Sequence, residues 1–246
     1  MISKSEIKFL KSLNLLKFRE KHKMFKVEGW RSIKEFIDSN YKMVDIYQSS
    51  DEICATFTHM KYKKIRKSDL KVISSFKNPN NVVAVFKIKN SKININSLKK
   101  EIGIYLEDVN IPGNLGSIIR TCDWFGINNV ICSNESVDVF NPKVVQASMG
   151  SLSRISVSYV NTEKFLFEIK KKNINSYVAD LDGKSIYVHP KLDNGIIFFG
   201  NEARGISNKI KDQVLNKISI PKKNTKCESL NLSVSLGVII SQIFRR

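Results

Sequence analysis

Residues 102–126 read IGIYLEDVNIPGNLGSIIRTCDWFG, a strand, a turn and a helix in immediate succession. The apolar run at 102–106 predicts a buried strand, and Pro112 with Gly113 turns the chain. Gly126 ends a helix predicted at 115–125, and Asn114 is well placed as the N-cap of that helix. The predicted buried stripe of the helix repeats at helical spacing: Leu115, Ile118, Ile119, Cys122 and Phe125.

The alternation of strand and helix continues to the end of the chain. Further strands are predicted at 129–132, 155–159, 176–181, 195–199 and 217–220. Further helices are predicted at 142–152, 163–173, 209–215 and 230–243. Strands that alternate with helices form βαβ units, whose mostly parallel sheet is covered on both faces. The sequence therefore predicts an α/β domain over residues 101–246.

The N-terminal part has a different pattern. Apolar residues at helical spacing predict helix over 2–36, with a break at 27–29. Short strands are predicted at 44–47, 72–76 and 82–86, and a short helix at 51–56. Residues 90–100 are polar and weakly patterned, which is typical of a linker. We therefore predict a smaller α/β domain over residues 1–95, ahead of the domain at 101–246.

The composition restricts the partners and the location. Lys and Arg number 41 against 23 Asp and Glu, so the net charge of +18 favours a polyanion such as nucleic acid. No apolar run approaches the ~20 residues that span a bilayer, and no signal peptide is recognisable. The four cysteines are scattered and the three histidines lie far apart. We expect no membrane association, no metal site and a reducing, cytoplasmic location.

Three loops that follow predicted strands are the candidates for a site, because ligands of α/β sheets bind at the carboxyl ends of strands. After the strand at 102–106, the helix N-terminus and Arg120 can hold an anion, although an ordinary capped helix with a solvated arginine explains the pattern as well. Neither a Walker loop nor a GxGxxG fingerprint is present. The first loop alone therefore does not decide between a site and a helix cap.

The second and third loops are rich in glycine and in small polar residues. Residues 200–207 read GNEARGIS, where Gly200 lets backbone approach a ligand and Ser207 can cap the next helix. Glu202 and Arg204 can also be an exposed pair on a turn. Residues 229–235 read SLNLSVS, which holds more small polar side chains than one helix cap requires.

Together these loops resemble the three motifs of the SpoU/TrmH family of RNA ribose 2′-O-methyltransferases, within the SPOUT superfamily. The matching stretches are PGNLGSIIRT at 112–121, GNEARGIS at 200–207, and IP at 220–221 followed by SLNLSV at 229–234, and NPKVVQASMG at 141–150 is similar as well. The resemblance implies a C-terminal SPOUT domain with a deep trefoil knot. The N-terminal part more loosely resembles an L30e-like substrate-binding domain, so residues 1–95 would bind RNA.

The resemblance also implies S-adenosylmethionine as the cofactor and transfer of its methyl group to a ribose 2′-hydroxyl. The implied cofactor-binding residues are Phe199, Gly200, Asn201, Ile220 and Leu230. The implied catalytic residues are Arg120, Asn114, Glu202, Ser229 and Asn231. Because arginine stays protonated, Arg120 either fixes a phosphate that helps to take the proton or stabilises developing alkoxide charge. The chain departs from the family at Trp124 and at Lys222-Lys223-Asn224.

The implied partners are RNA and a second copy of the chain. Segments 18–25 and 61–67 are candidate contacts to phosphates and unstacked bases, although each can also be a solvated basic surface. The family is dimeric through the helices of its first and third motifs. The leading hypothesis is a ribosomal RNA methyltransferase. The alternatives are a transfer RNA methyltransferase, a non-catalytic RNA-binding or assembly protein of the same fold, and a base methyltransferase.

Overall fold

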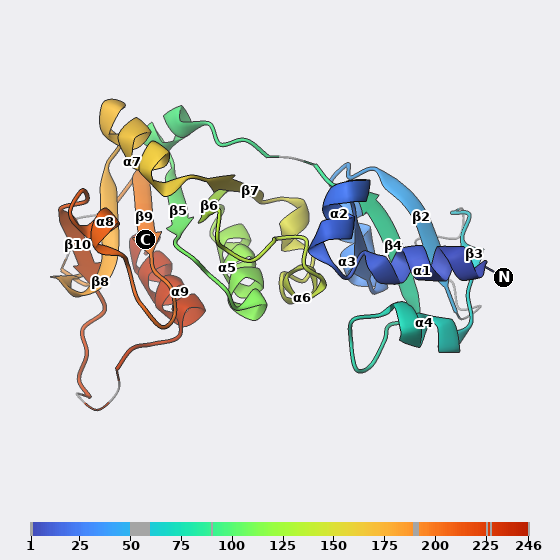
Figure 1. Cartoon of the computed structure of the whole chain (residues 1–246). Coiled ribbons are helices and arrows are strands. Elements are labelled where there is room, and N and C mark those ends of the chain that lie inside the picture. Colours follow the sequence, from blue (N-terminus) through green and yellow to red (C-terminus); the bar gives the residue numbers. More distant parts are fainter. Residues whose placement is uncertain are drawn as a thin grey trace. The chain divides into compact units, whose positions relative to one another are not determined.

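The computed structural model describes residues 2–49, 60–89, 91–188, 192–224, 226 and 228–245 (Figure 1). The chain forms two compact units. The first comprises Met1–Asn90 and Asp138–Arg154, and the second comprises Ser91–Val137 and Ile155–Arg246. A segment from the second half of the sequence therefore packs with the N-terminal residues.

The second unit is built on a six-stranded sheet in the order β10-β8-β9-β5-β6-β7, and all five neighbouring pairs are parallel. Its strands are β5 (Ile102–Leu106), β6 (Asn129–Ser133), β7 (Ser156–Val160), β8 (Ser176–Ser185), β9 (Gly195–Phe199) and β10 (Asn216–Ser219). Its α-helices are α5 (Pro112–Trp124), α7 (Thr162–Lys171), α8 (Asn208–Lys211) and α9 (Leu232–Ile243), and a 3-10 helix, η2, covers Ile95–Lys99. The prediction of an α/β domain with a mostly parallel sheet is confirmed.

The centre of this sheet is apolar on both faces. Every residue of β5 and β9 is buried, as expected for parallel strands covered on both sides. On one face, the ring of Tyr105 stacks on Phe165 of α7 at 5.4 Å between centroids and contacts Phe198 at 4.8 Å. Ile206, before α8, and Ile210, within it, belong to the same cluster. Helices α5 and α9 pack against each other elsewhere on the unit, side by side in Figure 1.

The strand order reverses between β5 and β9. From β5 the chain passes through α5 to its neighbour β6, whereas from β9 it passes through α8 to β10, beyond β8. The loops that leave these two adjacent strands therefore run in opposite directions. Such a switch point leaves a crevice at the carboxyl ends of the strands, where ligands of open α/β sheets bind. The trefoil knot stays a prediction from the family resemblance.

The first unit contains a four-stranded sheet in the order β1-β4-β2-β3, in which β4 pairs antiparallel with both β1 and β2. Its strands are β1 (Met24–Glu28), β2 (Met43–Gln48), β3 (Lys63–Lys64) and β4 (Val82–Lys87). Its α-helices are α1 (Lys4–Ser12), α2 (Leu16–His22), α3 (Trp30–Asp38), α4 (Lys67–Ile73) and α6 (Pro142–Ala147), and a 3-10 helix, η3, covers Ser151–Ser153. An aromatic group joins strands and helix: Phe25, Phe36 and Phe86 contact one another at 5.4–6.0 Å between centroids.

Several secondary-structure predictions differ from the structure, and the helix predicted at 209–215 ends at Lys211. The helix predicted over 2–36, with a break at 27–29, is wrong at residues 24–28, which form β1 in register with β4. The strand at 72–76 is wrong as well, since helix α4 ends there, with Leu70 and Ile73 buried at helical spacing. The helix at 142–152 ends early, at Ala147, because Met149 and Gly150 take positive φ angles of 51° and 95°. The helix predicted at 51–56 lies outside the described residues.

The Asp138–Arg154 segment is fixed within the first unit by charged contacts. Arg19 is only 2 % exposed, and its Nη2 lies 2.6 Å from Oδ2 of Asp138. The same guanidinium donates to the carbonyl of Leu13 at 2.9 Å. At the other end of the segment Arg154 pairs with Glu35. A buried guanidinium that lost its carboxylate would be left uncompensated, so Asp138 contributes to the stability of this unit.

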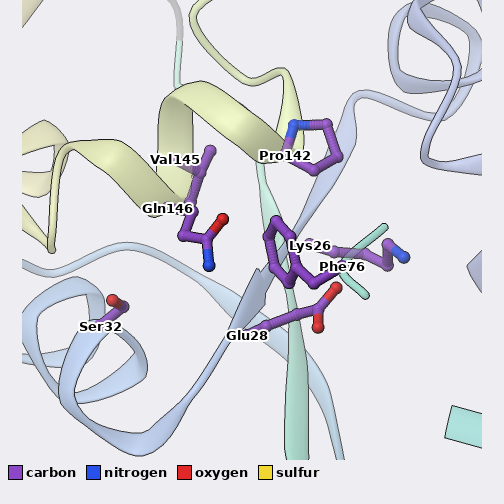
Figure 2. A pocket seen from close by; sticks show the side chains of 7 residues that line it. All are labelled: Lys26, Glu28, Ser32, Phe76, Pro142, Val145 and Gln146. Atoms are coloured by element: carbon purple, nitrogen blue, oxygen red, sulfur yellow. The ribbon is translucent and has the colours of Figure 1, made fainter. Parts of the chain in front are cut away.

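Lys26 is a second buried basic side chain of the first unit, 3 % exposed, and it lines a small hollow of about 10 Å³ (Figure 2). Its Nζ donates to the carbonyl of Ile73 at 2.5 Å, at the last residue of α4. Glu28, on the same strand, accepts from Ser74 Oγ at 2.7 Å. The hollow offers about the space of one water molecule, so Lys26 has a structural role there. Burial lowers the pKa of the Lys26 amine from its ordinary value of 10.5 to about 8.

We predict that Lys26 makes the protein less stable below pH 8 than above it. Because the folded-state pKa is about 8 and the unfolded value is 10.5, the unfolded chain binds more protons between these values, and stability from this group rises with pH across that window. Chemical denaturation gives the free energy of unfolding of the wild type and of Lys26→Met between pH 7 and pH 10.5. The difference between the two proteins should change by up to about 3 kcal/mol across this range. The exposed Lys21→Met is the matched control, and equal slopes in all three proteins would contradict the assignment.

Candidate active site

Asn114 connects the three loops at the carboxyl edge of the parallel sheet. Its Nδ2 donates to Oε1 of Glu202, in the loop after β9, at 2.8 Å. Its Oδ1 accepts from Nδ2 of Asn231, at the start of α9, at 3.1 Å. Asn114 itself is 7 % exposed. Residues from three separate motifs are therefore held by one amide, at the switch point between β5 and β9.

The position of Asn114 differs from the predicted one. Helix α5 begins at Pro112 with Ile111 as its N-cap, so Asn114 lies in the first turn and does not cap the helix. Proline suits the first helical position because its ring sets the required φ and its missing N–H costs no helical bond. The Asn114 side chain is thereby free to bond across the site.

The loop after β9 is a tight, closed turn. Asn201 and Gly205 exchange backbone hydrogen bonds of 3.0 and 2.9 Å. A Cβ at Gly200 would lie only 2.2 Å from the Gly205 carbonyl carbon, so glycine at 200 is required by the turn itself. Gly205 has a φ of +67°, which favours glycine. The loop therefore needs both glycines for its own conformation, whether or not a ligand approaches.

The side chain of Asn201 is used inside this loop. Its Oδ1 accepts from the backbone N–H of Ala203 at 2.9 Å and of Arg204 at 3.1 Å, while its Nδ2 donates to the carbonyl of Asp108 at 2.7 Å. Phe199 is 2 % exposed, and its carbonyl accepts from the backbone N–H of Glu107 at 2.9 Å. These two residues therefore shape the loop and fasten it to the end of β5.

Two acidic residues that the sequence analysis did not single out hold the β9 loop in place. Glu107 is 8 % exposed and accepts from Ser207, from its backbone N–H at 2.8 Å and from its Oγ at 2.6 Å. Asp108 has a φ of 51°, pairs with Arg204 at 3.0 Å and accepts from Ser133 Oγ at 2.7 Å. Ser207 is thus the N-cap residue of α8 while its side chain bonds Glu107. Glu107 and Asp108 come directly after a buried strand, and this position was the signal in the sequence from which they could have been found.

The third loop places Asn231 at the N-cap of α9, where its Oδ1 accepts from the backbone N–H of Ser233 at 2.9 Å. Ser233 Oγ also donates to this Oδ1, at 2.7 Å, and Ser235 Oγ donates to the Asn231 carbonyl at 3.1 Å. Ser229 is exposed, two residues before Asn231. The excess of small polar residues seen in the sequence is therefore partly a network around one cap.

Partly exposed apolar side chains, and backbone groups without hydrogen bonds to the protein, lie in the third loop beside this edge. Ile220 is half-buried and Leu230 is 47 % exposed. In the described part of the third loop, the backbone of residues 220–223 makes no hydrogen bond to the rest of the protein. Backbone donors and acceptors beside aliphatic side chains suit the polar edge and the flat face of an adenine. These residues fit the implied S-adenosylmethionine.

Arg120 lies apart from the Asn114 contacts. It is exposed on α5, nearly two helical turns beyond Asn114. Within the described residues no hydrogen bond or ion pair fixes its guanidinium. A permanently charged guanidinium exposed on α5 can meet an anionic group that approaches from solvent.

The predicted RNA-contact segment 18–25 is only partly at the surface. Arg19 and Phe25 are buried, at 2 % and 0 % exposure, so both are wrong as contacts: one pairs with Asp138 and the other belongs to the core. Phe18 and His22 remain half-buried, and Lys21 and Lys23 are exposed. In the segment 61–67, Ile65 is buried and Lys63 pairs with Glu6 and Asp45.

Across 2–49, 60–89, 91–188, 192–224, 226 and 228–245, no group of three or more His, Cys, Asp or Glu side chains could hold a metal ion. In that same part of the chain, no helix has both the length and the apolar character needed to cross a membrane.

A parallel sheet with linked loops at its switch point defines a ligand-binding α/β domain, here joined to a second unit. Residues 101–241 match the model of the SpoU rRNA methylase family, and residues 4–84 match an MRM3-like substrate binding domain. The chain belongs to the SpoU rRNA methylase family. The predicted family is confirmed, as is an N-terminal substrate-binding domain before the α/β sheet.

Individual proteins agree with this assignment. A structure from Porphyromonas gingivalis, assigned to the TrmH family of RNA methyltransferases, is 33% identical, with a TM-score of 0.86 over 99% of this chain and 98% of that one. The 23S rRNA (guanosine(2553)-2′-O)-methyltransferase RlmP of Bacillus subtilis is 23% identical over 96% of this chain and 94% of its own. The SpoU methyltransferase AviRb of Streptomyces viridochromogenes, solved with AdoMet, shares the fold: 20% identity, a TM-score of 0.86, and coverage of 98% and 97%.

We predict that Glu107 and Ser207 are energetically coupled. The buried Glu107 carboxylate accepts two hydrogen bonds from Ser207, which offset the cost of removing its charge from water. Changing either residue removes part of that stabilisation. In a double-mutant cycle of Glu107→Gln and Ser207→Ala, measured by urea unfolding, the coupling should be about 1–3 kcal/mol. Amide hydrogen exchange should also be faster at 200–207 in both variants. Additive effects in the cycle would contradict the coupling.

Proposed function

We propose that the protein is an S-adenosylmethionine-dependent methyltransferase that modifies a ribose 2′-hydroxyl of ribosomal RNA. The observation that carries the proposal is the pair of hydrogen bonds by which Asn114 joins Glu202 and Asn231 at the switch point of the sheet. Membership of the SpoU rRNA methylase family supports it. The similarity over nearly the whole chain to a B. subtilis 23S rRNA 2′-O-methyltransferase favours ribosomal RNA over transfer RNA.

The edge formed by the second and third loops would hold the cofactor. S-Adenosylmethionine, when bound, supplies a methyl group on a sulfonium. The Gly200–Asn201 turn offers a rigid wall, because its hydrogen bonds are made within the loop and to Asp108, just after β5. Ile220 and Leu230 offer apolar surface, and the open backbone of 220–223 offers donors and acceptors. Phe199 contributes through its backbone position only, since its side chain is buried.

The polar residues of the chain would orient the ribose and manage charge. Methyl transfer would form a bond from the 2′-oxygen to the methyl carbon and break the carbon–sulfur bond, so that the cofactor leaves as S-adenosylhomocysteine, while the hydroxyl proton passes to a neighbouring RNA phosphate or to water. Glu202 and Asn231 are held by Asn114, so they can fix a hydroxyl or the loop beside it without reorganisation. Arg120 carries a permanent charge and cannot take the proton. Its guanidinium instead stabilises negative charge on the 2′-oxygen or on a neighbouring phosphate.

The N-terminal domain would bind the RNA. Residues 1–95 are proposed as the substrate-binding domain and 101–246 as the methyltransferase domain, in line with the family regions matched at 4–84 and 101–241. The net charge of +18 suits a polyanionic substrate. A cytoplasmic location follows from such a substrate and remains part of this proposal.

Transfer to unmodified RNA tests the proposal. The purified chain is incubated with methyl-labelled S-adenosylmethionine and either transcribed 23S rRNA or transcribed tRNA, and the RNA is digested to nucleosides for mass spectrometry. We expect a 2′-O-methyl nucleoside from the rRNA. A mark on the base, a mark only in tRNA, or cofactor binding without transfer would each overturn a different part: the chemistry, the substrate or the enzymatic activity.

We predict that Arg120→Ala lowers the transfer rate by at least about 100-fold, because the positive charge that stabilises the reacting oxygen is lost. Arg120→Lys should keep part of the rate, since the charge remains while the planar fork is lost. Single-turnover transfer measures the effect on the rate, and calorimetric titration measures the effect on cofactor binding. Cofactor affinity should stay within about twofold of the wild-type value. Arg245→Ala is the exposed control, and wild-type activity of Arg120→Ala would remove this residue from the mechanism.

A homodimer through α5 and α9 belongs to the same proposal. The two helices contact each other, with the rings of Phe125 and Phe244 5.8 Å apart. Their outer surfaces nevertheless expose Trp124 at 85 %, Val234 at 50 % and Phe244 at 43 %. Large apolar side chains exposed on, and directly after, two helices that contact each other favour burial against another protein surface.

We predict that Trp124→Glu converts the dimer into monomers, because a carboxylate would have to be desolvated at the interface. Sedimentation velocity over a range of protein concentrations gives the association constant, which should fall by at least tenfold. Leu215→Glu is the matched control, since Leu215 is equally exposed, at 85 %, and lies directly before β10, away from α5 and α9 in the sequence. A wild type that sediments as a monomer would contradict the dimer itself.

A further inference from the structure

Helices α1 and α2 carry a small cluster of half-buried aromatic rings at the surface of the first unit. The ring of His22 packs edge-on to Phe9 at 5.1 Å between centroids, with an interplanar angle of 87°. The ring of Phe18 lies nearly parallel to His22, at 6.4 Å and 12°. Phe9 packs on the core below. The hydrophobic core therefore holds Phe9, Phe9 supports His22, and His22 is stacked with Phe18.

The Phe18 ring is covered by a lysine. Nζ of Lys17 lies 5.2 Å from the centroid of the ring, and the Lys17 side chain is exposed. A cation over an aromatic face at an exposed site is a weak contact, and a four-carbon side chain can swing aside. An incoming planar group can therefore reach this face of the ring, and the displaced ammonium stays close enough to meet an anion beside it.

The charges of α2 are sorted by face. At 100° per residue, Phe18, Lys21 and His22 share one side of the helix, and Glu20 lies on the opposite side. Arg19 is directed inward, where Asp138 neutralises it. The side that presents the aromatic rings is thus bordered by Lys17 and Lys21, both exposed.

We propose that Phe18 and His22, with Lys17 and Lys21, form a stacking platform for one unstacked base of a single-stranded RNA segment. The inference rests on the proposed function, in that RNA is taken as the partner. An aromatic face accepts any base by stacking, and ammonium groups at its border meet the flanking phosphates. An apolar protein partner fits less well, because docking it there would desolvate both lysines without a counter-charge.

Binding of short RNAs tests the platform without requiring catalysis. Fluorescence anisotropy measures the affinity of the full chain for a 12-nucleotide single strand and for a duplex of the same sequence, each at several salt concentrations. Phe18→Leu keeps the apolar volume and removes the aromatic face, so single-strand affinity should fall about tenfold, within the range for loss of one stacked base. Duplex affinity should not change, because paired bases are not available for stacking. Phe18→Tyr should bind as the wild type does.

Lys21→Ala separates charge from stacking. It should weaken the single strand and reduce the slope of log affinity against log salt by about 0.7, the value for one phosphate contact, whereas Phe18→Leu should leave the slope unchanged. Phe167→Leu is the control for a surface aromatic, since Phe167 is 64% exposed on α7. Circular dichroism and the unfolding temperature establish that each variant is folded.

Three outcomes overturn the platform: unchanged single-strand affinity in a folded Phe18→Leu variant, an equal loss for single strand and duplex, or a wild type that binds neither. The choice of RNA as the partner is overturned if the Lys17 and Phe18 surface binds a protein or vesicles and the variants do not change RNA affinity. Failure of the proposed function gives a different result, namely no methyl transfer by a wild type whose oligonucleotide binding still depends on Phe18.

Discussion

The hydrogen bonds of Asn114 are the contacts on which the candidate site depends. One amide, 7 % exposed, joins a loop after β9 to the start of α9. Because an amide has both donors and acceptors, it can bind a carboxylate and a second amide at once. Replacing it by an apolar residue would leave two polar side chains without that partner at the crevice. The convergence of three distant loops is therefore a consequence of side-chain hydrogen bonding as well as of sheet topology.

A second layer of contacts holds the β9 loop. Glu107 and Asp108 follow β5 directly, and they bond Ser207, Arg204 and the backbone around them. No catalytic role is assigned to these two carboxylates. Their role is to keep the Gly200–Gly205 turn rigid against the neighbouring strand, so that a ligand would meet a preformed wall and lose less conformational entropy on binding.

The first unit uses its basic residues in two ways. Arg19 and Lys26 are directed inward, where one neutralises Asp138 and the other caps α4. Lys17 and Lys21 stay in solvent beside aromatic rings. A high net charge by itself does not distinguish these uses, because lysine and arginine can bury their stems or their head groups according to the partners nearby.

The sequence by itself determined the order of strands and helices after residue 101, the α/β class and the three family motifs, because apolar periodicity and turn residues act over a few positions. It predicted that Asn114 and Glu202 belong to one site, although not that they bond each other. Only the tertiary structure decided that Asn114 bonds Glu202, that residues 24–28 form a strand, and that Arg19 is buried. Each of those outcomes depends on a partner far along the chain: Asn114 and Glu202 are 88 residues apart, and Arg19 and Asp138 are 119 apart. Local patterns carry no information on such pairings, which the packing of the whole chain establishes.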